Sequence, residues 1–200
     1  MASLEVIEVK PINIKFTTIN IVGDTPLIVH AWSEKVKKEM LDKQMKKAKT
    51  ARGAKDPQEE YRSAFYYLPD GRYGFPAVGF KTAAVSAGGR FSEGLKMTEL
   101  RGAFFVDGVD GTDLVAIEGE PTMREDMVRV GMGTADIRYR PEFRTWAVAL
   151  RVRFNADKIS IEQLVNLMNL AGFGVGIGEW RPERDGQFGC FHVELNALPA

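Results

Sequence analysis

Apolar and polar residues alternate over several stretches of the chain, and each alternation predicts a β-strand with one buried face. The alternation is faultless over residues 146–154. It also runs over residues 11–22, where the apolar phase changes between Phe16 and Ile19. Because one extra residue in a strand reverses its two faces, this change predicts a β-bulge at residues 17–18.

Shorter segments predict the remaining strands. Residues 103–106 and 114–117 are apolar and flank a turn rich in aspartate and glycine. Residues 191–195 alternate again and predict a last strand. Residues 121–144 contain glycine, arginine and proline with little sustained periodicity, which predicts a long hairpin or lobe that projects from the core.

Apolar residues at helical spacing predict three helices. Residues 161–171 follow a capping box that starts at Ser160. Residues 77–87 are rich in alanine, and we expect the glycine pair 88–89 to end that helix. A third helix, over residues 34–49, has only a narrow apolar stripe.

The order of these elements predicts an α+β fold. A strand, a helix, two strands, a helix and a strand pack most simply as a ferredoxin-like (RRM-like) antiparallel sheet with helices on one face. Two segments exceed that core: residues 33–66, a basic helical insertion, and the lobe 121–144. Within the insertion, residues 50–60 are polar and predict a flexible loop. We expect a single domain over residues 1–200.

Composition narrows the function classes. Hydrophobic residues make up 44% and charged residues 27% of the chain, so a wholly disordered chain is excluded. No apolar run approaches the roughly 18–20 residues of a membrane span, and the start lacks a signal-peptide core. One cysteine, Cys190, excludes an intrachain disulfide and a cysteine metal cluster. We therefore expect a cytoplasmic protein with no membrane partner, no metal and no cofactor.

The charges are balanced overall but not locally. Lys and Arg number 27, as do Asp and Glu. Between Lys35 and Lys55, however, nine basic residues stand against only Glu39 and Asp42: Lys35, Lys37, Lys38, Lys43, Lys46, Lys47, Lys49, Arg52 and Lys55. Such an asymmetry predicts one face for an anionic partner, although a charged helix face that is merely solvated remains the alternative.

A glycine-rich segment follows the last predicted helix. Four glycines occupy every second position: Gly172, Gly174, Gly176 and Gly178. A loop without Cβ atoms lets a phosphate reach backbone N–H groups, while Trp180 offers a stacking plane and Arg181 and Arg184 offer charge. The alternative is a glycine-rich turn packed closely against the sheet. Residues 138–144 also interleave cations with aromatic rings, as single-strand binders do, or form a hairpin with a mixed surface.

Three patches of the sequence resemble one family. The glycine-rich segment continues into Gly186-Gln187-Phe188-Gly189 before the last strand, residues 75–84 read FPAVGFKTAA, and residues 25–29 read TPLIV. In this order the patches are similar to the RAMP superfamily, the ferredoxin-like RNA-binding subunits of CRISPR systems. Lys81 matches the lysine of the family's first core helix, whereas Thr82 replaces the usual glycine.

The resemblance implies a function in antiviral defence. By resemblance, the glycine loop and the start of the first core helix contact an RNA backbone, and projecting lobes clamp nucleotides. The implied relatives are backbone subunits that polymerise along guide RNA. Partners would be RNA or single-stranded DNA, further copies of the chain, or other subunits of a ribonucleoprotein. At 200 residues the chain is short for such a subunit, which suggests a solitary or phage-borne homologue.

The leading hypothesis is a non-enzymatic protein that binds single-stranded nucleic acid, with RNA favoured. The residues expected to contact the strand are Lys35, Lys38, Lys46, Lys81, Arg90, Arg138, Tyr139, Arg140, Gly174, Gly176, Gly178, Trp180, Arg181 and Arg184.

Two other functions stay open. One is a metal-independent endoribonuclease with His30 as general base. Residues 27–30 are expected to be extended, which places His30 at a strand end where a base could work. By resemblance, guide-processing endoribonucleases of the superfamily often carry a general-base histidine in the N-terminal part of the chain. A structural role for His30 is the alternative. The other is a structural or inhibitory protein that mimics a CRISPR subunit.

Overall fold

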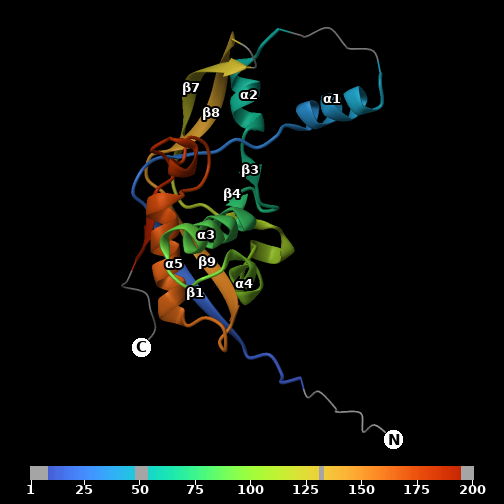
Figure 1. Ribbon diagram of the computed structural model, residues 1–200. Helices are drawn as coiled ribbons and strands as arrows, with labels where there is room; N and C mark the ends of the chain where they lie inside the picture. Colours follow the sequence, from blue (N-terminus) through green and yellow to red (C-terminus); the bar gives the residue numbers. More distant parts are fainter. Residues whose placement is uncertain (1–8, 48–53, 131–132, 195–200) are drawn as a thin grey trace, which may run out of the picture.

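A four-stranded antiparallel sheet lies at the centre of the computed structural model, which describes residues 9–47, 54–130 and 133–194 (Figure 1). Its strands are β1 (Ile14–Gly23), β5 (Phe104–Asp107), β9 (Ala147–Asn155) and β10 (Phe191–Val193), in the order β10-β1-β9-β5. With helix α3 between β1 and β5, and α5 between β9 and β10, this is the ferredoxin-like βαββαβ arrangement. The α+β fold class expected from the pattern is confirmed.

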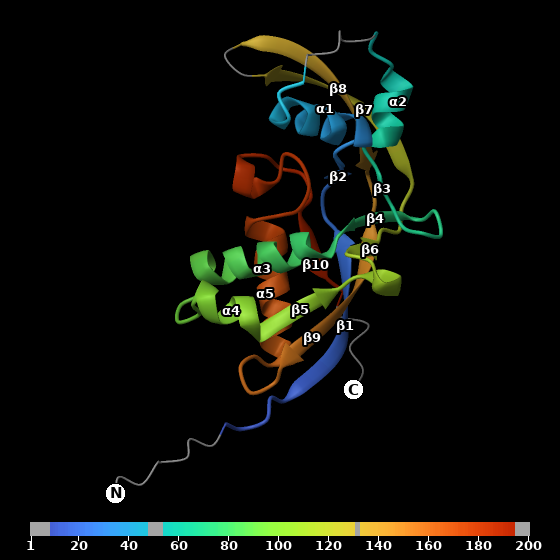
Figure 2. The same cartoon turned by 90° about the vertical axis from the view of Figure 1, so that its right-hand side faces the viewer.

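The helices cover one face of this sheet. Helices α3 (Ala77–Phe91) and α5 (Ile161–Gly174) pack against each other and on the sheet, and α4 (Met97–Ala103) packs beside α3 (Figure 2). Along β9, every second side chain is buried beneath them, as the alternation predicted. Phe80 of α3, Leu150 of β9 and Leu164 of α5 are fully buried in the core between these layers.

The first strand contains no bulge. Its register with β9 runs without interruption from the pair Ile14↔Asn155 to the pair Val22↔Ala147. The expected bulge at residues 17–18 is therefore wrong. The apolar phase changes because Ile19 faces the helices, whereas Ile14 and Phe16 lie exposed on the opposite face.

Two smaller sheets extend the molecule above the core. One contains β3 (Tyr66–Tyr67), β4 (Tyr73–Pro76) and β6 (Leu114–Ala116). The other contains β2 (Leu27–Ile28), β8 (Thr134–Phe143) and β7 (Pro121–Val130), in the order β2-β8-β7. Strands β7 and β8 form a long antiparallel hairpin that projects from the body, as expected for residues 121–144 (Figure 1).

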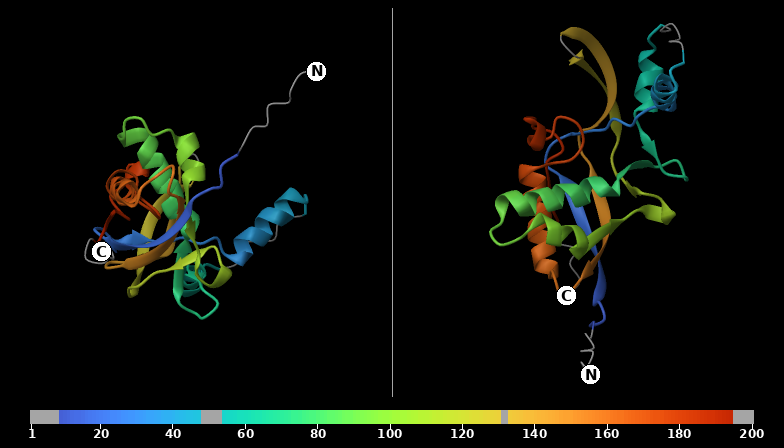
Figure 3. Two further views of the ribbon diagram at one scale, coloured as in Figure 1. Left: turned by 90° about the horizontal axis from the view of Figure 1, so that it is seen from below. Right: turned by 45° about the vertical axis from the view of Figure 1, so that its right-hand side comes forward.

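The insertion contains two helices instead of one. Helix α1 (Glu34–Gln44) is capped by Ser33, whose Oγ accepts a hydrogen bond of 3.3 Å from the Val36 N–H. It stands away from the body with no buried residue (Figure 3). Helix α2 (Pro57–Ser63) lies in the segment expected to be a flexible loop. That expectation is wrong for residues 57–60, because the Asp56 carboxylate caps two backbone N–H groups of α2.

Some expected features lie outside the described residues. They are Lys49 of the predicted third helix, residues 50–53 of the predicted loop (which include Arg52), Gly131 of the lobe, and Leu195 of the last strand.

Two helix ends differ from the prediction, and packing explains both. Helix α3 continues through Gly88 and Gly89, where a Cβ would collide with Leu100 and Met97 of the neighbouring segment. Helix α5 continues beyond residue 171 and takes in Gly172 and Gly174. These glycines thus serve close helix packing.

Candidate nucleic-acid interface

A groove of about 530 Å³ lies between α3 and the segment 175–190, which we call the glycine loop. Helix α3 contributes Thr82, Ser86 and Arg90 to its wall. The glycine loop contributes backbone and charged side chains, and the lining also includes His30, which follows β2, and Tyr66 of β3. Segments far apart in the sequence therefore place hydrogen-bond donors and acceptors in one concave site.

Backbone hydrogen bonds, within the loop and to neighbouring segments, hold the glycine loop in place. Gly176 and Gly178 line the groove with φ of +69° and +76°, a conformation that L side chains rarely adopt. The Gly176 N–H donates to the Ala171 carbonyl at 2.8 Å, so it is not open to a phosphate as the sequence suggested. The N–H of Gly178 donates to no group within the described part of the chain.

The other glycines are explained by contact with the loop or sheet. A Cβ at Gly172 would overlap the Phe191 carbonyl oxygen, and one at Gly174 would meet the Phe91 ring. A Cβ at Gly186 or Gly189 would overlap a carbonyl oxygen of the loop. The alternation of glycines therefore reflects packing at most positions, and Gly174 does not line the groove.

One carboxylate joins the two arginines of the groove. Glu183 Oε1 accepts from Arg90 Nη2 at 3.1 Å, and Glu183 Oε2 accepts from Arg181 Nη2 at 2.9 Å. Ser86 Oγ also donates to Glu183 at 3.1 Å. The position between the two guanidinium groups is thus already occupied by an anion of the protein itself.

The surroundings of Glu183 favour its charged form. Burial raises the pKa of this carboxyl, but hydrogen bonds from Arg181 and Ser86, with the charges of Arg181 and Arg90, lower the pKa overall. A site that holds one carboxylate in this way has the charge and donor geometry to hold a phosphate oxygen.

His30 and Glu179 form a second pair of interacting side chains that line the groove. His30 Nδ1 is 3.5 Å from Glu179 Oε1. The bond from His30 lowers the pKa of Glu179, with support from the charges of Arg140 and Arg181 against the opposing effect of burial. Burial and the Glu179 charge together raise the pKa of Tyr66. His30 is therefore a histidine beside a carboxylate, in a groove that Tyr66 also lines.

A shallower concavity of about 370 Å³ adjoins the groove and shares Gly178, Glu179 and Arg181 with it. Trp180 and Arg184 complete this concavity. Trp180 is 43% exposed, and its φ of 55° is unusual for a residue other than glycine. Arg184 is exposed, and no carboxylate among the described residues lies within ion-pair distance of it. The structure thus brings the indole ring of Trp180 together with the cationic side chains of Arg181 and Arg184.

The lysines of α1 form a separate basic surface. Lys37 and Lys47 pair with Glu34 and Asp42. Lys35, Lys38 and Lys46 are also exposed, and within residues 9–47, 54–130 and 133–194 none of the three pairs with a carboxylate. Because His30 lines the groove and Ser33 caps α1, the helix begins only a few residues from the groove.

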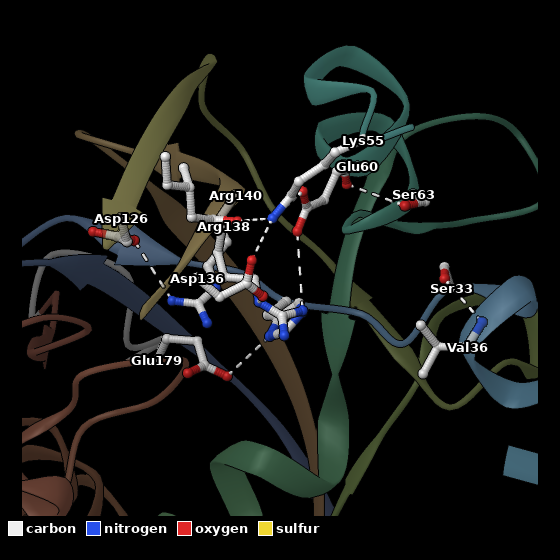
Figure 4. A network of polar contacts seen from close by, with 12 residues as sticks. Ser33, Val36, Lys55, Glu60, Ser63, Asp126, Asp136, Arg138, Arg140 and Glu179 are labelled. Carbon is white, nitrogen blue, oxygen red and sulfur yellow. Dashed lines mark hydrogen bonds and ion pairs between the residues drawn. The ribbon is translucent and has the colours of Figure 1, made fainter. Parts of the chain in front are cut away.

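The hairpin cations are occupied by carboxylates. Arg138 pairs with Asp136 at 3.0 Å and with Glu60 of α2 at 3.9 Å, and Lys55 joins the same network (Figure 4). Arg140 is only 6% exposed and lies 3.5 Å from Asp126. Arg140 therefore lies beneath the hairpin surface, contrary to its expected contact with a strand.

The remaining expected residues occupy other positions. Tyr139 is a half-buried residue of the hairpin, and burial and Glu125 raise its pKa. Lys81 lies outside the groove, with Nζ 3.7 Å from the centre of the Phe105 ring. Glu183 is not among the residues expected from the sequence, although its position between Arg181 and Arg184 is a usable signal for an internal ion pair.

The described residues contain no cluster of metal-binding side chains and no helix that is long and apolar enough to cross a membrane. No protein-family model and no curated protein matches the sequence. Among solved structures, the chain is similar to the crystal structure of Cmr6 from Pyrococcus furiosus. The sequence identity is 10% and the TM-score 0.45, over 92% of this chain and 100% of that one. A likeness at this level carries no functional inference.

Proposed function

We propose that this chain binds single-stranded nucleic acid, with RNA favoured, through the sugar–phosphate backbone, as a RAMP-like protein. The observation that carries the proposal is the Arg90–Glu183–Arg181 arrangement, in which two guanidinium groups from different elements converge on one anion. A phosphate group offers the same acceptor geometry as the carboxylate. Trp180 and Arg184 lie directly beside it and supply a stacking plane and a further cation.

The acceptor oxygens of the groove support RNA over DNA. The hydroxyl groups of Ser86 and Thr82 donate to Glu183 and to backbone carbonyls of α3, but their oxygens can still accept, as can the Glu179 carboxylate. A ribose 2′-OH both donates and accepts hydrogen bonds, and it is the group by which proteins separate RNA from DNA. The groove therefore offers partners that a deoxyribose would leave unused.

Assembly of several copies along one strand belongs to the same proposal. Helix α1 has no buried residue, and Val36, Met40, Leu41 and Met45 are each at least 40% exposed. Exposed apolar side chains on one helix are typical of contact surfaces. The lysines of the same helix place this surface where it would lie close to phosphates.

Removing the competing carboxylate tests the proposal. In Glu183→Gln, the affinity for a labelled oligouridine should rise about ten-fold, because a phosphate no longer displaces a negative charge. The single amide oxygen can replace only one carboxylate oxygen, so it accepts either from Arg181 or from Arg90 and Ser86. The backbone hydrogen bonds of the glycine loop do not involve this side chain and keep the loop in place. Fluorescence anisotropy at fixed salt concentration measures the change.

Glu99→Gln is the matched control for this experiment. Glu99 is 67% exposed in its side chain, lies on α4 and changes the net charge by the same amount. If both variants bind the oligouridine equally, general charge explains the gain and the groove has no special role.

One observation favours a second function, a metal-independent endoribonuclease. The His30–Glu179 pair lines the same groove, and a histidine held by a carboxylate at one ring nitrogen can accept a proton at the other. As general base, His30 would remove the proton of a ribose 2′-OH, whose oxygen then attacks the adjacent phosphorus. A 2′,3′-cyclic phosphate forms, the bond from phosphorus to the 5′-oxygen of the next nucleotide breaks, and that oxygen takes a proton from water.

Incubation of labelled RNA with the protein in EDTA separates the two functions. The binding proposal expects intact RNA with both the wild-type chain and His30→Ala. Discrete cuts by the wild-type chain that vanish in His30→Ala would establish the endoribonuclease instead.

A further inference from the structure

The face of the four-stranded sheet opposite the helices carries two exposed phenylalanines. Phe16 of β1 is 59% exposed and Phe105 of β5 is 41% exposed, although large apolar side chains on a sheet are normally covered. Figure 2 shows that α3, α4 and α5 all lie on the other side of this sheet. Both rings therefore stand on a face that the described residues leave open.

The strand register places the two rings in one row. Phe16 on β1 and Phe105 on β5 both pair directly with Arg153 on β9, the strand between them. Side chains directly opposite on neighbouring strands point to the same face. The row across three strands thus reads phenylalanine, arginine, phenylalanine.

Cationic side chains lie near both rings. Lys81 Nζ lies 3.7 Å and the Arg153 guanidinium 4.9 Å from the Phe105 centroid, and the Arg151 guanidinium lies 5.6 Å from the Phe16 centroid. Asp107 pairs with Arg153 at 3.0 Å, but within the described ranges no carboxylate pairs with Lys81 or Arg151. Burial and the nearby Arg153 charge lower the pKa of Lys81, so Lys81 is a cation held close to another cation.

We propose that this open sheet face, centred on Phe16 and Phe105, binds the bases of the same single strand, while Lys81, Arg151 and Arg153 contact its phosphates. The inference rests on the proposed function and adds a second surface to it. Exposed aromatic rings among cations are the features with which proteins hold unpaired bases. Lys81 precedes the groove residue Thr82 on α3 and reaches Phe105 on the edge strand β5, so it connects the groove to the open face.

Charge complementarity selects a polyanion over a second copy of the chain. In a two-fold contact, each surface faces itself. Such a contact on this face would bring the arginines of one copy against those of the other. A nucleic acid instead supplies phosphates for the cations and flat bases for the rings.

Phe16→Ala and Phe105→Ala test the proposal with two strands of equal length, an oligouridine and a strand of abasic ribose spacers. Each variant should weaken oligouridine binding about ten-fold, because a base loses its stacking partner. Binding of the abasic strand should not change. Phe173→Ala is the matched control, since Phe173 is 86% exposed on α5 and lines neither concavity. Thermal unfolding confirms that each variant is folded.

The outcomes separate this inference from the proposed function. If the wild-type chain binds oligouridine, Arg184→Glu weakens that binding and both phenylalanine variants bind like the wild type, the open-face inference is overturned and the groove proposal stands. If the wild-type chain binds neither strand, both fail. If Phe16→Ala converts a dimer to a monomer in light scattering, a second copy covers this face and the inference is overturned.

Discussion

Gly172→Ala is expected to destabilise the fold by about 3 kcal/mol or more, although alanine is the better helix former. Gly172 is a buried residue of α5, and a Cβ at this position would overlap the carbonyl oxygen of Phe191 in β10. Relief requires a backbone shift, which would disturb the pairing of Phe191 with Gly23 of β1. Urea unfolding followed by circular dichroism measures the loss.

For Gly102→Ala we expect no loss of stability. Gly102 lies in helix α4, and the space where its Cβ would stand is open. The variant should therefore be as stable as the wild type or more stable by up to about 1 kcal/mol. Equal destabilisation by both alanines would mean that α5 does not approach β10 as closely as described.

The double variant Arg181→Glu/Arg184→Glu is expected to weaken oligouridine binding about a hundred-fold at low salt. It removes two cations beside Trp180 and replaces them with charges that repel phosphates. Arg184 alone tests the site without disturbing the loop, because Arg181 also donates to the Gly178 carbonyl and to Glu183. Arg184→Glu should therefore give an intermediate loss in the same anisotropy assay.

A charge-matched control belongs with this variant. Lys96→Glu/Arg101→Glu changes the net charge equally, at exposed positions in and next to α4. This control should bind almost as the wild type does. Comparable losses in the two double variants would show that only the overall charge matters, and the groove would lose its assignment.

The core of the fold could be predicted because its signals are local. The alternation in β9 and the capping box at Ser160 each determine an element without help from distant residues, and both are confirmed. The two-residue strand β3 gave no such signal, because a strand of this length is defined only by its partner, whereas β2 lies within the extended segment expected over residues 27–30. Helix α2 was missed because its sequence resembles a polar loop apart from the Asp56 cap and Pro57.

In the first strand, a correctly observed change in the hydrophobic pattern led to a wrong prediction, the bulge at residues 17–18. The change of apolar phase after Phe16 is real, but a bulge was only one way to explain it. The other way is a regular strand whose outer face is itself apolar at one end. Distinguishing the two requires knowledge of which face the helices cover, and that depends on residues more than fifty positions away.

The candidate site could be predicted only in part. Sequence proximity correctly grouped Trp180, Arg181 and Arg184, which share one concavity. It did not reveal that most of the glycines serve packing, because a close backbone approach and an open loop produce the same pattern. It also did not reveal Glu183 as the anion between Arg90 and Arg181, since Arg90 lies on another helix.

The salt dependence of oligouridine affinity tests the central claim most directly. A strand that contacts about four cations should give a slope of about −3 in a plot of log K against log salt concentration, since each phosphate contact on a single strand contributes about −0.7. The Arg181→Glu/Arg184→Glu variant should give a clearly shallower slope. A wild-type slope near zero, or an unchanged slope in the variant, would contradict binding of a nucleic-acid backbone at this groove.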